Sequence, residues 1–437
     1  MERRRAPEVS VLHEAFRRGF AGVREWLPER VKREVVAYLR CGDVRYGFVE
    51  VTCEGCRESR LVAFSCKGRG WCPSCTTRRA IETGCHVEAL VPHLAHRQWT
   101  LSLPFSLRVA VVKQPSLLKR LEVWLVKAIW HRQRVNARRL GAKGNLTGAG
   151  VCFWQWFGSR LQLTPHLHLL VPEAVWTSAA DVVEVPPPDD AEVHAVLQRV
   201  LRKAAKHWPD DATAWAEDEY QALQHEAVQS RLGLNDVPTA QSRRKSLVAV
   251  AHGFSLHADT AVHRNDRQGL ERLARYGARG PVAECRLMRL EDGRYQYTPK
   301  KGVTFTVTAE ELVRRLVALV PPPRRHLTSF HGLYAPNARL RPTFAPAPKV
   351  AAPTTTPPQK KQSRPKTKRR LDWATLHQHT FGTDVLLCPK CGCRRRIRAL
   401  FSTWATAEAR LAKLGLTLSP RLLPNATAPP QLPLAFT

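Results

Sequence analysis

The most informative part of the chain is the stretch Pro165-His166-Leu167-His168-Leu169, in which two histidines flank a leucine inside an apolar run. Side chains of a β-strand alternate between its two faces, so both histidines would point to one face, roughly 6–7 Å apart at their Cα atoms. Two imidazoles at that separation can converge on one divalent cation. The alternative is a buried strand whose two histidines are structural, and the pair alone does not separate these interpretations.

The preceding residues favour the metal site. Residues 151–157 are rich in β-branched and aromatic side chains, and Gly158-Ser159 offers a turn before the histidine run. This pattern predicts a β-hairpin. Gln155 would then lie opposite the histidines as a third ligand for Mg²⁺ or Mn²⁺. A His-hydrophobic-His strand with such a neighbour resembles the metal site of the HUH endonuclease superfamily, whose members cut single-stranded DNA with a tyrosine.

The charge of the chain predicts a polyanionic partner. Its 437 residues include 69 Lys and Arg against 37 Asp and Glu, a formal net charge of +32. Such an excess attracts nucleic acid without reading its sequence, and a ribosomal or chromatin protein would show it too. No run of about 18 apolar residues predicts a membrane span. No apolar segment follows the basic start, so we expect a cytoplasmic, nucleoid-associated protein.

The spacing of the cysteines predicts a structural zinc site. Cys53-x2-Cys56 and Cys72-x2-Cys75 are 15 residues apart, which is typical of a zinc ribbon in which two turns close one tetrahedral four-sulfur site. Cys41 and Cys66 are further candidates that could replace one of the four or support a second site. In a reducing compartment, clustered thiols suit metal better than disulfides.

Basic residues near this ribbon are candidate DNA contacts. Trp71 and Phe64 lie among them, and arginine or lysine beside aromatic rings can contact phosphates and stack on unpaired bases. Ordinary surface charges and core rings explain the same pattern equally well. The candidates in this region are Lys67, Arg69, Arg78 and Arg79.

Tyr276 is the candidate nucleophile among the seven tyrosines. Asn265-Asp266 can cap a helix with apolar residues at helical spacing, and Gly277 can end it. Tyr276 would then lie in the last turn, near the further DNA-binding candidates Arg275 and Arg279. Tyr334 is the second candidate.

Several motifs in one order resemble the IS91-family transposases, including their ISCR relatives, from about residue 10 to about residue 400. The position one helical turn before Tyr276 holds Arg272, so the resemblance implies a single-tyrosine enzyme. The motifs are residues 64–75 at the end of the ribbon, 101–105, 165–168, 253–257, 275–283 and 331–338.

The resemblance implies a transposase that nicks and rejoins single-stranded DNA at mobile-element ends through a 5′-phosphotyrosine, supporting rolling-circle-type transposition. Its partners would be the element ends, target DNA and the host replication machinery. A plasmid relaxase or replication initiator would share this core, and a non-catalytic zinc-ribbon regulator would explain the charge and the cysteines but not the histidine pair.

We therefore expect an α+β chain in four parts. Residues 1–95 form a helical, zinc-binding DNA-recognition domain, and residues 96–341 an HUH-like antiparallel sheet with helices and a helical insertion near 176–245. Residues 342–370 are a flexible basic linker. Residues 371–437 carry Cys388-Pro389-Lys390-Cys391, half of a zinc ribbon. Its completion would need Cys393, His377, His379 or another chain, and an unmetallated turn is the alternative.

Overall fold

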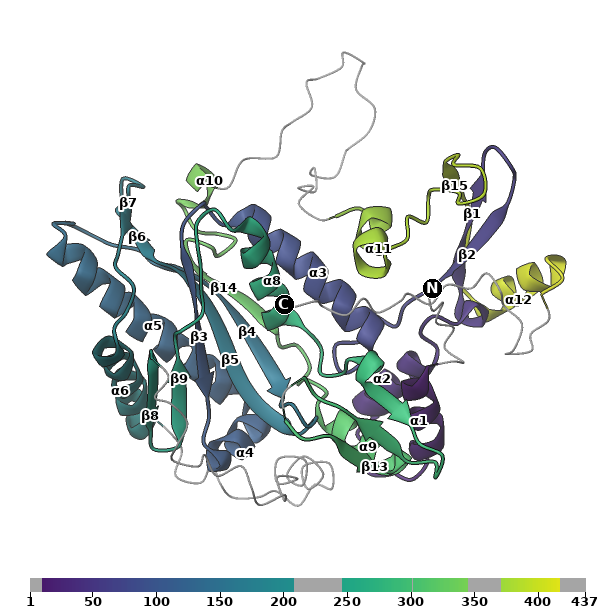
Figure 1. Cartoon of the computed structure of the whole chain (residues 1–437), viewed down its shortest axis with the longest axis horizontal. Helices are drawn as coiled ribbons and strands as arrows, with labels where there is room; N and C mark the ends of the chain where they lie inside the picture. Colours follow the sequence, from purple (N-terminus) through teal and green to yellow (C-terminus); the bar gives the residue numbers. More distant parts are fainter. Residues whose placement is uncertain (1–9, 208–245, 301, 345–370, 417–437) are drawn as a thin grey trace, which may run out of the picture.

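The computed structural model describes residues 10–207, 246–300, 302–344 and 371–416 (Figure 1). A seven-stranded antiparallel sheet with helices on both faces forms its centre, and this confirms the predicted α+β class. Six of its strands follow one another in the order β14 (Thr328–Gly332), β4 (Ala149–Phe157), β5 (Leu163–Pro172), β3 (His96–Ser102), β9 (Phe254–His257) and β8 (Val248–Ala251). The seventh strand, β10 (Ala261–Val262), also pairs with β3.

One face of the sheet carries the helices α4 (Phe105–Lys113), α5 (Pro115–Arg139) and α6 (Asp190–His207). The helix α5 begins with Pro115 in its first turn, where no backbone donor is lost. Trp154 of β4 packs on this side with the apolar stripe of α5.

The opposite face is covered by α3 (Pro73–Leu90) and α8 (Arg267–Ala278), which pack against each other. Phe153 of β4 belongs to the core on this side, because neighbouring residues of a strand point to opposite faces. The predicted cap of α8 forms: Asp266 accepts a hydrogen bond from the backbone N–H of Gly269 at 2.7 Å.

The N-terminal part contains α1 (Val11–Gly19), α2 (Glu29–Leu39), the 3-10 turn η2 (Val44–Tyr46) and the hairpin of β1 (Phe48–Cys53) and β2 (Ser59–Ala63). The C-terminal part returns to it. Its strand β15 (Arg395–Phe401) pairs with β1, so three strands run in the order β15-β1-β2. Figure 1 shows these yellow and purple segments side by side, with α11 (Trp373–Phe381) and α12 (Trp404–Lys413) nearby.

The remaining elements form small additions. A three-stranded sheet of β11 (Leu287–Arg289), β12 (Tyr295–Tyr297) and β13 (Phe305–Val307) follows the short turn η3 (Glu284–Arg286) and leads into α9 (Ala309–Ala318), which packs on α1. The strands β6 (Ala174–Trp176) and β7 (Val182–Glu184) form a hairpin, and the short helix α10 (Arg341–Phe344) follows β14.

Part of the predicted insertion over residues 176–245 is seen as β7 and α6, and its residues 208–245 lie outside the described residues. Residues 345–370, most of the predicted basic linker, also lie outside them. Within the described chain, no helix has the length and apolarity to cross a membrane.

Candidate functional site

The predicted hairpin of β4 and β5 forms and brings three candidate ligands onto one face. In its register Gln155 lies opposite His166, and His168 lies two residues further along β5. All three therefore share the face that carries α8. The imidazole rings of His166 and His168 lie 5.0 Å apart between centroids.

Hydrogen bonds orient both histidines through their Nδ1 atoms. His168 Nδ1 lies 3.0 Å from the hydroxyl of Thr100 on β3, and His166 Nδ1 lies 2.8 Å from the main-chain oxygen of Thr164. A partner on one ring nitrogen that leaves the other for a cation is the arrangement of metal-binding histidines. His168 Nε2 is buried and has no hydrogen-bond partner.

Burial keeps these histidines in the form that binds metal. Desolvation lowers the pKa of His166 to about 4, and burial, together with the nearby His166, lowers the pKa of His168 well below its usual value. Both rings are therefore neutral near pH 7 and carry a lone pair. This neutral pair faces the C-terminal end of α8.

Gln155 connects the strand to that helix. Its amide Nε2 donates to the main-chain oxygens of Tyr276 at 2.7 Å and Gly277 at 3.0 Å. Two carbonyl acceptors can be satisfied only by the NH₂ group, so the amide oxygen points elsewhere. That oxygen is buried without a hydrogen-bond partner.

The unpartnered Gln155 oxygen and His168 Nε2 support a fit to a divalent cation, because buried polar atoms normally have partners. Two imidazoles and an amide oxygen are compatible with Mg²⁺ or Mn²⁺ when water and phosphate oxygens complete the shell. His166, His168 and Gln155 are thus the residues that could hold this ion.

Tyr276 lies in the last turn of α8, beside the histidines. Its ring centroid is 5.6 Å from that of His168, and the Arg279 guanidinium carbon lies 4.6 Å from the same Tyr276 centroid. Gly277 allows the close packing of α8 on β4: a Cβ atom there would meet the Phe153 ring at 2.6 Å. The sequence could not supply this contact, which sets how near Tyr276 comes to the sheet.

The second candidate, Tyr334, is placed differently. Its side chain is fully buried, and its hydroxyl lies 2.9 Å from His96 Nε2. Burial raises the pKa of Tyr334 well above its usual value. These features are those of a structural tyrosine in the core between the sheet and α8.

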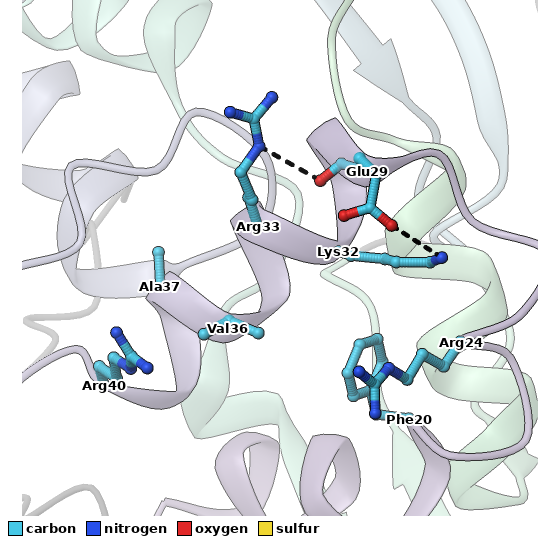
Figure 2. A pocket seen from close by; sticks show the side chains of 8 residues that line it. All are labelled: Phe20, Arg24, Glu29, Lys32, Arg33, Val36, Ala37 and Arg40. Carbon is cyan, nitrogen blue, oxygen red and sulfur yellow. Dashed lines mark hydrogen bonds and ion pairs between the residues drawn. The ribbon is translucent and has the colours of Figure 1, made fainter.

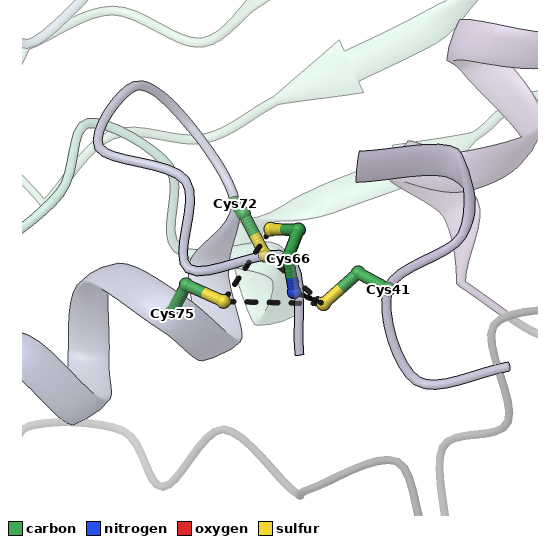
Figure 3. A group of neighbouring side chains, drawn as sticks. All are labelled: Cys41, Cys66, Cys72 and Cys75. Carbon is green, nitrogen blue, oxygen red and sulfur yellow. Dashed lines mark hydrogen bonds between the residues drawn. The ribbon is translucent and has the colours of Figure 1, made fainter. Parts of the chain in front are cut away.

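Eight of the twelve cysteines form two groups of four, and this corrects the predicted pairing. The first group joins Cys72 and Cys75, at the start of α3, to the two further candidates Cys41 and Cys66 (Figure 3). Three of its sulfur pairs lie 3.4–3.9 Å apart, and all four sulfurs lie within 4.8 Å of one another. Hydrogen bonds with the neighbouring thiols, together with burial, raise the pKa of Cys72, and a divalent cation would offset the charge of four thiolates.

The second group consists of Cys53, Cys56, Cys388 and Cys391. The prediction that Cys53, Cys56, Cys72 and Cys75 share one ion is therefore wrong. The reason is the hairpin of β1 and β2: Cys53 and Cys56 lie at its turn, whereas Cys41 precedes β1 and Cys66 follows β2 at the open end. Five paired residues span about 17 Å, too far for one ion.

Two of the predicted DNA-binding arginines, Arg69 and Arg79, are held by hydrogen bonds to main-chain oxygens. Arg79 donates to the main-chain oxygens of Lys67 and Gly68, and Arg69 donates to those of Pro322 and Arg325. Arg69 and Arg79 also line a crevice with Arg279 that reaches the aromatic side chains Trp154, Trp156 and Phe157 of β4.

Two further candidates, Arg78 on α3 and Arg275 on α8, do not line this crevice. Arg275 forms an ion pair with Glu271 at 3.4 Å, and Arg78 lies on the half-buried surface of α3. Contact between DNA and the six candidate residues Lys67, Arg69, Arg78, Arg79, Arg275 and Arg279 stays a prediction.

A second, strongly basic pocket lies along α2 and the segment that joins it to α1 (Figure 2). Lys32 forms an ion pair with Glu29 at 3.0 Å, and Arg33 donates to the main-chain oxygen of Glu29. Arg24 and Arg40 are exposed at opposite ends of the pocket. Phe20, Val36 and Ala37 supply its apolar lining.

No sequence pattern singled out Glu122, which connects α5 to β4 and β14 on the face of the sheet that carries α5. This buried carboxylate of α5 accepts hydrogen bonds from Lys119, Trp154 of β4, and Ser329 and His331 of β14. Burial alone would raise the pKa of Glu122, but these four donors outweigh it and lower the pKa to about 2. A charged residue within an otherwise apolar helix stripe was the available signal.

Two comparisons with protein families match separate parts of the chain. Residues 12–103 match the family "Transposase zinc-binding domain" (Zn_Tnp_IS91), and residues 150–341 match the family "Putative transposase" (Y2_Tnp). The first range contains all four cysteines of the Cys41 group, and the second contains both histidines, Gln155 and Tyr276. Neither the curated proteins nor the solved structures contain a match.

Proposed function

Because this chain belongs to the IS91-type transposases with an N-terminal zinc-binding domain, we propose that it cuts and rejoins single-stranded DNA at the ends of a mobile element through Tyr276. A transposase acts on DNA, and the formal charge of +32 suits that substrate. The tyrosine chemistry, the single-stranded substrate and the catalytic metal are the parts that this proposal adds.

The observation that carries the proposal is the convergence of Tyr276 with the ligand face of β4 and β5. Its ring lies against His168, and its own main-chain oxygen accepts the Gln155 amide. A nucleophile, a candidate cation site and a cation over the nucleophile's ring, Arg279, thus meet at one place. A purely DNA-binding regulator would not need this arrangement.

His166, His168 and Gln155 would hold Mg²⁺ or Mn²⁺, which polarises the scissile phosphate when bound. A phenol has an ordinary pKa of about 10 and is a weak nucleophile at neutral pH. The Arg279 guanidinium, 4.6 Å from the centre of the Tyr276 ring, would stabilise negative charge on a phosphate beside that ring.

The cleavage step exchanges one ester bond for another. The Tyr276 oxygen bonds to phosphorus, the bond from phosphorus to the 3′ oxygen breaks, the phenol loses its proton and the 3′ oxygen gains one. The products are a 5′-phosphotyrosine and a free 3′-OH. The ester retained on the protein allows later rejoining without ATP, and the 3′-OH can prime replacement synthesis by the host replication machinery.

The position of Arg272 supports a mechanism with one tyrosine. It occupies the site one helical turn before Tyr276 and lies 3.8 Å from Asp266, the N-cap of α8. One active site would therefore hold one covalent strand at a time. This suits the rolling-circle-type transposition that we propose.

The packing of the zinc-binding part against α8 supports a role in presenting DNA to this site. The helix α3, whose N-cap is Cys72, packs along α8, and the side chain of Arg275 fills the space beside Gly84 of α3. We propose that the N-terminal module recognises the element ends and that the arginine crevice guides the strand toward Tyr276.

The test is incubation of the purified chain with single-stranded DNA that carries the element's ends, in the presence of Mg²⁺. The expected product is a protein-linked 5′ fragment that disappears in excess chelator. A chain that binds this DNA without forming the adduct would be a regulator. Equal cutting of a plasmid transfer or replication origin would favour the relaxase or initiator.

A further inference from the structure

We propose that Cys53, Cys56, Cys388 and Cys391 bind a second structural Zn²⁺ that fastens the C-terminal segment to the N-terminal module. The four sulfur atoms all lie within 4.8 Å of one another. Cys53 Sγ lies 3.4 Å from Cys391 Sγ, and Cys56 Sγ lies 3.7 Å from Cys388 Sγ. Tetrahedral zinc with bonds of about 2.3 Å separates its sulfurs by about 3.8 Å, close to these values.

Both halves of the site are built as tight turns. On the N-terminal side, Cys53 N–H donates to the main-chain oxygen of Glu58 at 2.9 Å and closes the turn between β1 and β2. On the C-terminal side, Cys388 exchanges backbone bonds with the next residues: its N–H donates to Cys393 and its oxygen accepts from Gly392, each at 2.9 Å.

Two glycines make these turns possible. Gly392 has a φ of +72°, a backbone conformation that residues other than glycine adopt only at a cost in free energy. Gly55 faces the opposite turn so closely that a Cβ atom would meet Cys393 Sγ at 2.7 Å. The two turns therefore fit one another as well as a shared ion.

The surrounding charge also suits thiolates. Arg395 is 4% exposed, and its guanidinium lies 3.7 Å from Cys388 Sγ and 3.8 Å from a carboxylate oxygen of Glu58. A Zn²⁺ with four thiolates carries a net charge of −2, so a buried guanidinium beside it is stabilising. The same guanidinium donates to the main-chain oxygen of Leu387 at 3.0 Å and so holds the C-terminal turn in place.

The ion would join parts of the chain that are far apart in sequence. Cys56 and Cys388 are 332 residues apart, and a cross-link over so long a loop restricts the unfolded chain strongly. The zinc site would reinforce the pairing of β15 with β1 and the packing of α12 against Val44, Phe48 and Leu61. The C-terminal segment then acts as a part of the zinc-binding module, independently of the chemistry proposed at Tyr276.

The test is the zinc content of the full chain, measured by inductively coupled plasma mass spectrometry. We expect two ions per chain for the unchanged protein and one for Cys388→Ser or Cys391→Ser. The matched control is Cys393→Ser, which changes an exposed neighbour outside the group and should retain two. The ion that remains at the Cys41 group reports that the variants are folded.

A second measurement follows the fastening itself. Limited proteolysis should release residues 371–416 faster from Cys388→Ser than from Cys393→Ser. One zinc per unchanged chain, two retained by Cys388→Ser, or loss of one by Cys393→Ser would overturn the proposal. Loss of both ions from Cys388→Ser would also overturn it, because two separate sites would not empty together.

Discussion

The side-chain amide of Gln155 donates a hydrogen bond to the main-chain oxygen of Tyr276 over 2.7 Å. One residue thus links the proposed ligand face of the sheet to the helix that carries the proposed nucleophile. The amide nitrogen holds α8 in place, and the amide oxygen is buried without a hydrogen-bond partner. Positioning of Tyr276 and binding of the cation would therefore be coupled.

Substitutions of Gln155 should separate these two roles. Gln155→Ala should slow cleavage roughly tenfold, less than loss of a histidine, because water can replace a neutral amide ligand. Gln155→Glu should lower the melting temperature more than Gln155→Ala does, because a carboxylate would face two carbonyl oxygens. Cleavage rates and thermal unfolding measure the two effects. Equal cleavage by Gln155→Ala and the unchanged chain would remove Gln155 from the site.

Loss of a histidine should remove cleavage and leave DNA binding. We expect no cleavage by His166→Ala or His168→Ala, with retained affinity for single-stranded DNA, since phosphate contacts come mainly from lysine and arginine. Thr100→Val is the matched control, because it keeps both histidines and removes only the partner of His168 Nδ1. It should weaken apparent metal affinity about 10–100-fold and be rescued by more Mg²⁺. Full activity of His168→Ala in excess chelator would contradict a metal site.

The sequence predicted the elements of the site because their signals are local. The β4–β5 hairpin follows from strand propensity and a turn, and the start of α8 follows from the Asp266 cap. The Cys53 pairing depended instead on a strand more than 300 residues away, and no local signal specifies that β15 returns to β1. The Cys388-Pro389-Lys390-Cys391 motif showed only that a zinc site there needed two more ligands from elsewhere.

The contacts that position Tyr276 were also beyond sequence reasoning. The close approach of Gly277 to Phe153 and the bond from Gln155 to the α8 backbone depend on how the helix crosses the sheet. The predicted boundary between residues 95 and 96 separates α3 from β3, yet α3 packs on α8 within one core. Helix packing of this kind is set by side-chain shape over several elements.

Glu122→Gln should destabilise the chain in a pH-dependent way. The pKa of Glu122 is about 2, below its ordinary 4.5, so ionisation stabilises the folded state at neutral pH by about 3 kcal/mol. This contribution is complete above about pH 4.5 and is lost as the pH falls toward 2. The stability difference between the two chains, from denaturant unfolding at matched pH, should be constant from pH 8 to 5 and shrink below. A difference unchanged down to pH 2 would contradict the assignment.

The basic pocket along α2 should contribute to DNA affinity. Replacing the exposed Arg24 and Arg40 together by alanine should weaken single-stranded DNA binding and lower its dependence on salt by up to about two counterions. Lys32→Ala is the internal control, since Lys32 is already paired with Glu29. Binding titrations at several salt concentrations measure both. An unchanged salt slope in the double variant would show that this pocket does not contact phosphates.

The most direct test of the proposed chemistry is the identity of the residue that becomes linked to DNA. Tyr276→Phe removes only the phenolic oxygen, so folding and DNA binding should persist while the covalent adduct disappears. Tyr334→Phe should keep the adduct and lose about 1 kcal/mol of stability with its bond to His96. Mass spectrometry of the linked peptide should place the phosphodiester on Tyr276, and an adduct that survives in Tyr276→Phe but vanishes in Tyr334→Phe would contradict the account.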